Sequence, residues 1–361
     1  MNAENLTDAQ KAVVFIDAFE KLEYKKKVNL LSAFDNPKRI FTVEKDDKRL
    51  FERIKEVFPF VATALSRKAF VLEMINSSLK KADGVITLFD EGYPTELKNT
   101  PVPPLVLYYR GNARLLDEKT KVSMVGSRVT LPLYYKAAQN ISDTLSAAGA
   151  VIVTGIADGG DDAAIKGALN NGRLISVLAG GLDCVYPQSK ISLAEEIAEK
   201  GLLITEYPAG RPPRDFTYPV RNRIIAGLGI AAIIISGSAK SGARYTAGYA
   251  ADYGREVLAF PYGLSVKSGE LCISLLKQGA TLIENAEDVA GALGITIDKK
   301  EEIKLEGTEL AVYGQISAGV GDANKIIEKT GLKPYEISAA LGMLELKGVI
   351  VRSGTEYQTV K

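Results

Sequence analysis

The chain has 361 residues, enough for two or three domains, and its 46% hydrophobic and 25% charged content is ordinary for a globular protein. Its 45 basic and 44 acidic residues nearly cancel, so affinity for a polyanion would have to come from a local patch of charge. The absence of histidine excludes Ser-His-Asp and Cys-His catalysis and the usual zinc sites. The two cysteines, Cys184 and Cys272, are too few for a disulfide framework.

No part of the sequence predicts a targeting or membrane segment. Apolar runs stay well short of the roughly 18 residues that a membrane span requires. The first ten residues, MNAENLTDAQ, are polar and lack the layout of a signal peptide. We therefore expect a cytoplasmic protein that makes no contact with a membrane.

Residues 1–80 are predicted to form a small helical domain of the SAM or helix-hairpin type. Apolar residues recur at helical spacing, as Val13, Val14, Phe15, Phe19 and Leu22. A basic run at 25–27 is typical of a solvated helix face.

Residues 81–295 alternate short apolar runs with segments long enough to hold a helix. Nine runs are predicted to be strands, at 85–89, 105–109, 122–127, 150–155, 174–179, 201–207, 230–236, 256–261 and 281–284. Near-continuous apolar strands followed by crossover helices indicate a parallel sheet covered on both faces. The predicted fold class is α/β, with a Rossmann-like doubly wound parallel sheet as its core.

A polar linker at 296–305 precedes a last domain at 306–361. Three helices at 309–315, 322–330 and 334–347 and a hairpin with its turn at Ser353-Gly354 predict a winged helix. This domain carries six basic and seven acidic residues, whereas a DNA reader concentrates positive charge. DNA binding and protein contact are therefore both open for it.

Ligands of doubly wound sheets bind beyond the carboxyl ends of the strands, where the strand order reverses. Glycines and backbone amides gathered there favour anions, and guanidinium groups add bidentate contacts to phosphate. We expect four basic residues to converge on one electropositive crevice: Arg128, Arg221, Arg223 and Lys240. Phe216, Tyr218 and Tyr245 are the candidate stacking residues.

The common nucleotide fingerprints are missing from these strand ends. Gly126-Ser-Arg is not followed by the G-x-G-x-x-G spacing, and the segment 237–242 lacks the closing Gly-Lys-Ser/Thr of a P-loop. The sequence therefore predicts no dinucleotide cofactor, no other cofactor and no ATP hydrolysis.

Several motifs together resemble the DprA/Smf family of DNA-processing proteins, with the likeness strongest over 84–293. They include VSMVGSR at 122–128, VIVTGIADGGDDAAIKGAL at 151–169, YPVRNRIIAGL at 218–228 and SGARYTAGYAADYGREVLAFP at 241–261. The resemblance implies a cytoplasmic homodimer that binds single-stranded DNA without sequence preference during natural transformation. It also implies that the protein protects the strand, loads the recombinase RecA and has no established catalytic activity.

The motif matches assign DNA-binding or phosphate-binding residues one by one. The assigned positions are Gly126, Ser127, Arg128, Gly155, Arg221, Asn222, Arg223, Ser241 and Gly242, to which the basic Lys190, Lys240 and Arg244 are added. In this interpretation Arg128 faces DNA phosphates while Gly126 and Ser127 let the strand lie close.

The sequence departs from the family pattern near the crevice. Asp158 stands where many members carry a basic residue, Ile165 replaces a histidine, and Gln188 replaces a basic residue that often follows Tyr-Pro. Extra acid should weaken DNA affinity by repulsion. We expect Arg244 to offset part of this repulsion, and Lys190 follows close to Gln188 in the sequence.

Two other functions stay open. One is a nucleotide sensor or a LOG-like nucleotide-processing enzyme, in which Glu206 would act as base and Asp158, Asp161 and Asp162 could hold Mg²⁺. A Pro-Gly-Gly-x-Gly-Thr loop, which those enzymes use, is missing here. The other is an adaptor in which only protein contacts matter, which the near-neutral winged helix favours.

Overall fold

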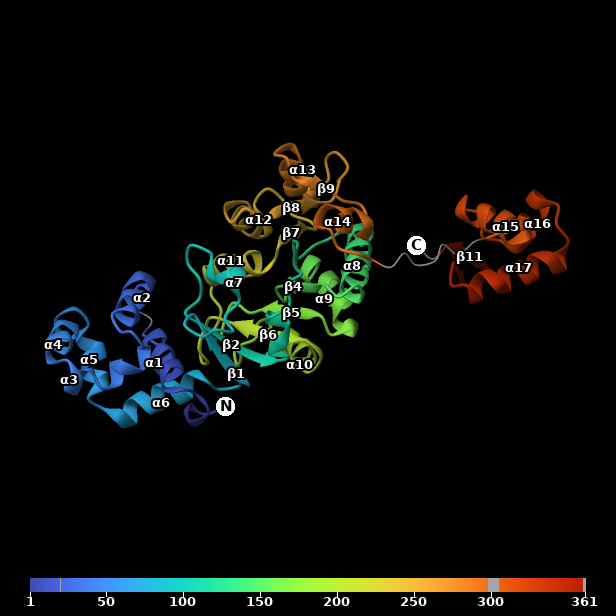
Figure 1. Ribbon diagram of the computed structural model, residues 1–361. Helices are drawn as coiled ribbons and strands as arrows, with labels where there is room; N and C mark the ends of the chain where they lie inside the picture. The colour runs from blue at the N-terminus through green and yellow to red at the C-terminus, as the bar shows by residue number, and fades with distance from the viewer. Residues whose placement is uncertain (20, 298–304, 360–361) are drawn as a thin grey trace. The chain divides into compact units, whose positions relative to one another are not determined.

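A computed structural model describes residues 1–19, 21–297 and 305–359 of the chain (Figure 1). The chain forms two compact units, Met1–Ile297 and Asp298–Lys361. Most of the linker predicted at 296–305 lies outside the described residues.

The first unit is built around a nine-stranded sheet. Its strands are β1 (Gly84–Thr87), β2 (Val106–Gly111), β3 (Lys121–Val125), β4 (Val151–Thr154), β5 (Leu174–Val177), β6 (Leu202–Thr205), β7 (Ala231–Ile234), β8 (Glu256–Ala259) and β9 (Thr281–Leu282). The spatial order is β1-β2-β6-β5-β4-β3-β7-β8-β9. Strands β3 to β9 pair in parallel, and β2 and β1 add an antiparallel edge beside β6. The predicted doubly wound parallel core is confirmed, and its strand order reverses between β3 and β7.

Helices follow the strands and cover the sheet. They are α7 (Thr95–Lys98), α8 (Pro132–Ala147), α9 (Gly160–Ala168), α10 (Ile191–Lys200), α11 (Thr217–Leu228), α12 (Ala243–Asp252), α13 (Glu270–Lys277) and α14 (Ala286–Leu293). Every residue of β3, β4, β5, β6 and β7 is buried. Strands buried on both faces need apolar side chains at nearly every position, which explains the continuous apolar runs in the sequence.

Six helices precede the sheet in the same unit. They are α1 (Asp8–Asp17), α2 (Tyr24–Ser32), α3 (Val43–Asp46), α4 (Lys48–Val57), α5 (Pro59–Leu65) and α6 (Lys68–Ser78). Thr7 and Gln10 form a capping box that starts α1, and α1 packs against β1 and β2 at the antiparallel edge (Figure 1). Of the basic run, Lys25 and Lys26 are exposed, whereas Lys27 pairs with Asp17 at 3.1 Å.

The second unit is a winged helix. It contains α15 (Gly307–Ser317), α16 (Ala323–Thr330), α17 (Pro334–Leu346) and the hairpin of β10 (Ile350–Ser353) and β11 (Glu356–Thr359). Ser353 pairs with Glu356, so the hairpin turn is Gly354-Thr355, one residue later than predicted. Val312, Ile326, Ile337 and Leu344 belong to a separate apolar core of this unit.

Among residues 1–19, 21–297 and 305–359, no helix is both long enough and apolar enough to span a bilayer.

Candidate nucleic-acid interface

A crevice of about 760 Å³ opens beyond the carboxyl ends of β3 and β7. This is the point where the sheet order reverses, as the rule for doubly wound folds predicts. Its lining comes from the loops after β3, β4, β7 and β8 and from one face of α11. The polar lining residues include Ser127, Arg128, Asp161, Tyr218, Arg221, Asn222, Ser238, Ser241, Thr246, Lys267 and Ser268.

Glycines let two backbone segments touch beneath the crevice. A Cβ atom on Gly126 would stand 2.9 Å from the Cα atom of Gly160, and one on Gly160 would overlap the backbone of Gly126. Gly159 has a φ of 74°, a left-handed conformation that favours glycine. The end of β3 therefore lies directly against the start of α9, and these glycines serve the architecture of the loop.

Three hydroxyl groups fasten the loop that carries Arg128. The backbone N–H of Ser127 donates to the carbonyl of Ser236 at 3.0 Å. The hydroxyl of Ser236 lies 3.0 Å from that of Ser127 and 2.8 Å from that of Thr130. Because Ser236 is fully buried, this cluster anchors the loop to the end of β7. Ser127 thus positions its neighbour, Arg128.

Arg128 is the exposed cation of this loop. In the described part of the chain, no carboxylate lies within ion-pairing distance of its guanidinium. Burial raises the pKa of the Tyr218 phenol, and the nearby charge of Arg128 partly offsets that rise. Arg128 also lines a second hollow of about 170 Å³ together with Asp158 and Tyr186. It therefore borders both hollows with its charge unpaired.

Arg221 reaches the crevice from α11, but its guanidinium is buried and engaged. One nitrogen donates to the carbonyl of Val177 at the end of β5, and Nε donates to Oδ1 of Asn222 at 3.1 Å. A Cβ atom on Gly155 would come within 2.8 Å of Nη2 of Arg221 and would overlap the carboxylate of Asp161. Gly155, which the motif match assigns to the DNA-binding set, therefore makes room for these two side chains and lines neither hollow. Burial raises the pKa of Asp161, and the charge of Arg221 opposes this rise.

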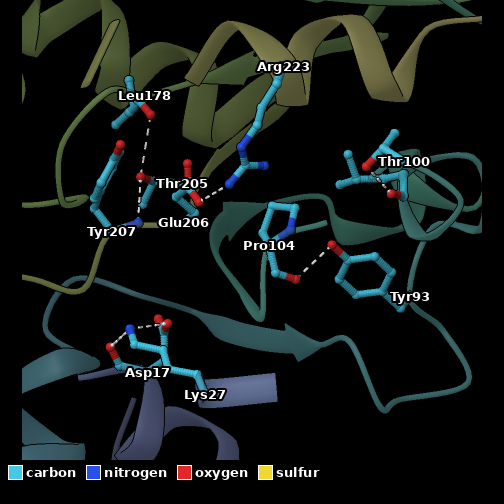
Figure 2. A network of polar contacts seen from close by, with 11 residues as sticks. Asp17, Lys27, Tyr93, Thr100, Pro104, Leu178, Thr205, Glu206, Tyr207 and Arg223 are labelled. Carbon is cyan, nitrogen blue, oxygen red and sulfur yellow. Dashed lines mark hydrogen bonds and ion pairs between the residues drawn. The ribbon is translucent and has the colours of Figure 1, made fainter. Parts of the chain in front are cut away.

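Arg223 does not lie in the crevice, which corrects the expectation that it would join Arg128 there. Residues two apart on an α-helix point about 200° away from each other, so Arg221 and Arg223 lie on different faces of α11. Arg223 is only 8% exposed and forms an ion pair with Glu206 (Figure 2). The Asp17–Lys27 pair of the N-terminal helices lies nearby. We call Asp17, Lys27, Glu206 and Arg223 the seam cluster.

The residues proposed for enzymatic chemistry are also engaged elsewhere. Glu206 belongs to the seam cluster and lines neither hollow. Lys190 is buried and pairs with Asp158 at 2.7 Å and Asp162 at 3.4 Å. The described residues contain no group of three or more ligands that could hold a metal ion. Lys190 belongs to the predicted DNA-binding set, but it is buried and its charge is engaged by these two aspartates, which corrects that assignment. Neither the base nor the Mg²⁺ hypothesis gains support.

The loop between β7 and α12 contributes part of the remaining predicted set. Ser241 and Gly242 line the crevice, and the carbonyl of Gly242 accepts a hydrogen bond from the amide of Asn222 at 3.2 Å. Lys240 and Arg244 are exposed but are not among the residues that line the crevice. The guanidinium of Arg244 lies over the ring of Tyr245 at 4.8 Å.

Sequence reasoning missed one cation of the crevice, Lys267. It lies in the loop after β8, in a short 3₁₀-helix (Lys267–Gly269), and it is exposed. Because β8 pairs in parallel with β7, its loop opens at the same edge of the sheet. The rule that ligands bind beyond the carboxyl ends of parallel strands could have identified Lys267 as a candidate. Val129, Leu131 and Val266 add an apolar wall.

Comparisons with known proteins agree with this geometry. The family model for DNA recombination-mediator protein A matches residues 84–294, and the DprA winged helix domain matches 299–354. Protein Smf of Synechocystis is 35% identical over 239 residues, which are 64% of this chain and 60% of that protein. The match thus covers less than two thirds of that relative. DNA processing protein DprA of Bacillus subtilis is 35% identical over 205 residues, which are 56% of this chain and 69% of that protein.

Solved structures give the same result. DNA processing protein A of Streptococcus pneumoniae has a TM-score of 0.66 and 28% identity over 81% of this chain and 98% of its own. DNA processing protein A of Helicobacter pylori, described for its single-stranded DNA binding mode, has a TM-score of 0.53 and 30% identity over 58% of this chain and 95% of its own. The family model that matches more than half of the chain, the winged-helix match and the 35% identity to the Bacillus subtilis protein place this chain in the DprA/Smf family.

Proposed function

We propose that the crevice binds single-stranded DNA through its phosphate backbone and holds the strand without cutting it. The observation that carries this proposal is the exposed guanidinium of Arg128 at the switch point of the sheet, which no carboxylate of the described residues pairs with. Lys267 supplies a second cation to the same crevice. Polyanions are attracted most strongly to cations that no carboxylate already neutralises.

The lining also supports binding without sequence preference. Asn222 is the side-chain amide best placed to read base edges, but its oxygen accepts from Arg221 and its nitrogen donates to Gly242. Tyr218 offers a ring for stacking, and Val129 and Leu131 offer apolar contact. A cationic groove with aromatic and apolar surface is typical of single-strand binders. The Helicobacter pylori neighbour, described as binding single-stranded DNA, adds support.

We further propose the cellular role that family membership suggests. The protein would act in the cytoplasm, process incoming DNA during natural transformation, load RecA and form a homodimer. DNA-processing relatives from several bacteria support this role.

Binding measured with the full chain tests the crevice assignment. Fluorescence anisotropy with labelled oligo-dT, a duplex of equal length and thymidine monophosphate as competitor, at about 50 and 200 mM salt, separates the ligand classes. We expect oligo-dT to bind best and Arg128→Ala to weaken it about tenfold, while the salt slope falls by about one. Arg49→Ala, at an exposed position on α4, is the matched control.

Equal affinity of the Arg128→Ala variant and the parent for oligo-dT would overturn the assignment. Preferential binding of the mononucleotide would favour a nucleotide sensor instead. Release of free base from nucleoside monophosphates would favour a nucleotide-processing enzyme.

A further inference from the structure

Helix α17 of the winged helix is apolar on two opposite faces. One face packs into the core of the unit through Ile337, Leu341 and Leu344. The other face exposes Tyr335 at 66% and Leu346 at 84%. A helix that is apolar all round is normally buried on both sides. The outer face of α17 therefore has the composition of a contact surface.

The exposed apolar residues form a continuous stripe. Tyr335, Ala339, Met343 and Leu346 are spaced four, four and three residues apart, which places them on one face of a helix. Ala339 and Gly342 are small, so another backbone can approach the middle of the stripe closely. We call these four exposed residues the α17 stripe.

A groove of about 300 Å³ between α15 and α17 runs beside the stripe. Ala339, Ala340 and Met343 supply its apolar surface, and Tyr335 contributes an aromatic ring. Glu309 of α15 and Glu336 of α17 supply its charged lining. The groove thus combines apolar surface with the carboxylate of Glu336 and with the ion pair between Glu309 and Lys347.

The charges of α17 argue against nucleic acid as the occupant. Residues 334–346 contain Glu336 and Glu345 but neither lysine nor arginine. The two lysines that flank the helix are engaged at its ends: Lys347 pairs with Glu309 at 2.5 Å, and the ammonium group of Lys333 lies 5.9 Å from the centre of the Tyr335 ring. A helix that enters a DNA groove needs basic or amide side chains toward phosphates and bases. Phosphates placed along this face would instead meet two carboxylates.

A second copy of the same helix is also a poor match. In an antiparallel pair of α17 helices centred on the stripe, Tyr335 would face Leu346 of the second copy, and both side chains would be buried favourably. The same register sets Glu336 opposite Glu345 of the second copy, twice. A parallel pair would face each glutamate with itself. Like charges in such positions destabilise a helix pair.

We propose that the α17 stripe and its groove dock an amphipathic helical segment of another protein, with apolar anchors flanked by lysine or arginine. The apolar anchors would cover Tyr335, Ala339 and Met343, and the basic flanks would meet Glu336 and Glu345, since Glu309 already pairs with Lys347. This follows the helix-in-groove mode of peptide recognition. The proposal uses residues of the second unit alone, whereas the proposed DNA crevice is formed by residues of the first unit, so it does not rest on the proposed function.

Two labelled peptides of equal apolar content test this proposal with the full chain. One peptide carries leucines at helical spacing flanked by lysines, and the other carries the same leucines flanked by glutamates. We expect the basic peptide to bind at least about tenfold more tightly in anisotropy titrations. We expect Ala339→Arg to weaken it at least about tenfold, because the change places a positive charge in the groove. Asn324→Arg, at an exposed position on α16, is the matched control.

Other variants and readouts distinguish the alternatives. Leu346→Ala removes an exposed anchor and should also weaken the basic peptide, with circular dichroism unchanged. Arg128→Ala should leave peptide binding unchanged. A wrong assignment of the DNA crevice would therefore not affect the test of the peptide site. The proposal is overturned if neither peptide binds, if both bind equally, or if Ala339→Arg has no effect. It is likewise overturned if Ala339→Arg turns a dimer into a monomer in sedimentation, or weakens oligo-dT binding.

Discussion

Two arginines of α11 end in different regions of the same unit. Arg221 points to the crevice and lies beside Asp161, whereas Arg223 points to the seam cluster and pairs with Glu206. Both residues are buried, and each guanidinium group lies near a carboxylate. Arg128, on a loop held by hydroxyl groups, is exposed and unpaired among the described residues. The burial and ion pairing of a cation, more than its place in a motif, therefore decide whether it can bind a ligand.

The seam cluster joins the N-terminal helices to the sheet. Asp17 is the last residue of α1, Lys27 lies within α2, and Glu206 follows β6 (Figure 2). Oε1 of Glu206 and Nη1 of Arg223 are buried and find no hydrogen-bond partner within the part of the chain that the structure describes. Burial raises the pKa of Glu206, and Arg223 opposes this rise. Each charge in the cluster therefore depends on its partner.

The largest expected effect comes from breaking this pair. Arg223→Met leaves Glu206 buried without its counter-charge, and removing one member of a buried ion pair costs about 3–5 kcal/mol. We expect the free energy of unfolding in urea to fall by about that amount. The affinity of the folded variant for oligo-dT should stay close to that of the parent.

The double variant Arg223→Met/Glu206→Leu is the matched control. Replacing both charges by apolar groups is often neutral or stabilising. A single variant as stable as the parent, or a double variant no more stable than the single, would contradict the structural role assigned to Arg223.

The next effect concerns the glycines beneath the crevice. Gly160→Ala would force a methyl group into the backbone of Gly126, and overpacking of this kind costs about 1–3 kcal/mol. Because the loop bearing Arg128 would shift, oligo-dT affinity should fall as well. Thermal unfolding and anisotropy on the same preparations measure both effects.

Gly248→Ala provides the comparison for that change. Gly248 lies on α12 with open space around its Cα atom, so alanine should stabilise the helix by about 0.5–1 kcal/mol. Equal stability of the two variants would contradict the close approach between β3 and α9.

The strands could be predicted to within three residues because parallel strands buried on both faces are continuous apolar runs. Part of the crevice could be predicted for a similar reason, since Gly126, Arg128 and Ser241 follow such strands directly. The direction in which the Arg223 side chain points could not be predicted. Ile224, Ile225 and Leu228 make α11 apolar on several sides, so the sequence does not show which face of the helix is buried. Lys267 belongs to no recognised motif, so only its position in the loop after β8 could have identified it. The ion pair between Lys190 and Asp158 could not be predicted either, because the two residues are far apart in the chain.

A smaller effect on DNA binding is expected from Lys267. Lys267→Ala removes one exposed cation from the crevice, so oligo-dT affinity should fall about threefold to tenfold, with the salt slope reduced by about one. The free energy of unfolding should stay unchanged because the side chain is exposed. Lys48→Ala, at an exposed position on α4, should leave the affinity at its parental value. An effect of equal size in both variants would mean that net charge, and not the crevice, governs binding.

The smallest effect concerns Asp162, which accepts a hydrogen bond from Tyr135 at 2.6 Å and pairs with Lys166 at 3.0 Å. Burial alone would raise its pKa, but these partners and Lys190 outweigh burial, and the pKa lies below its usual 3.8. A folded-state pKa below the unfolded value means that the ionised group stabilises the fold above pH 3.8, and that this contribution is lost as the pH falls through the folded-state pKa. Asp162→Asn should therefore cost up to about 1 kcal/mol at neutral pH. In urea unfolding the difference from the parent should shrink steadily as the pH falls toward 3. A difference that grows on acidification would show that Asp162 is held by burial, and that Lys190 is committed to Asp158 alone.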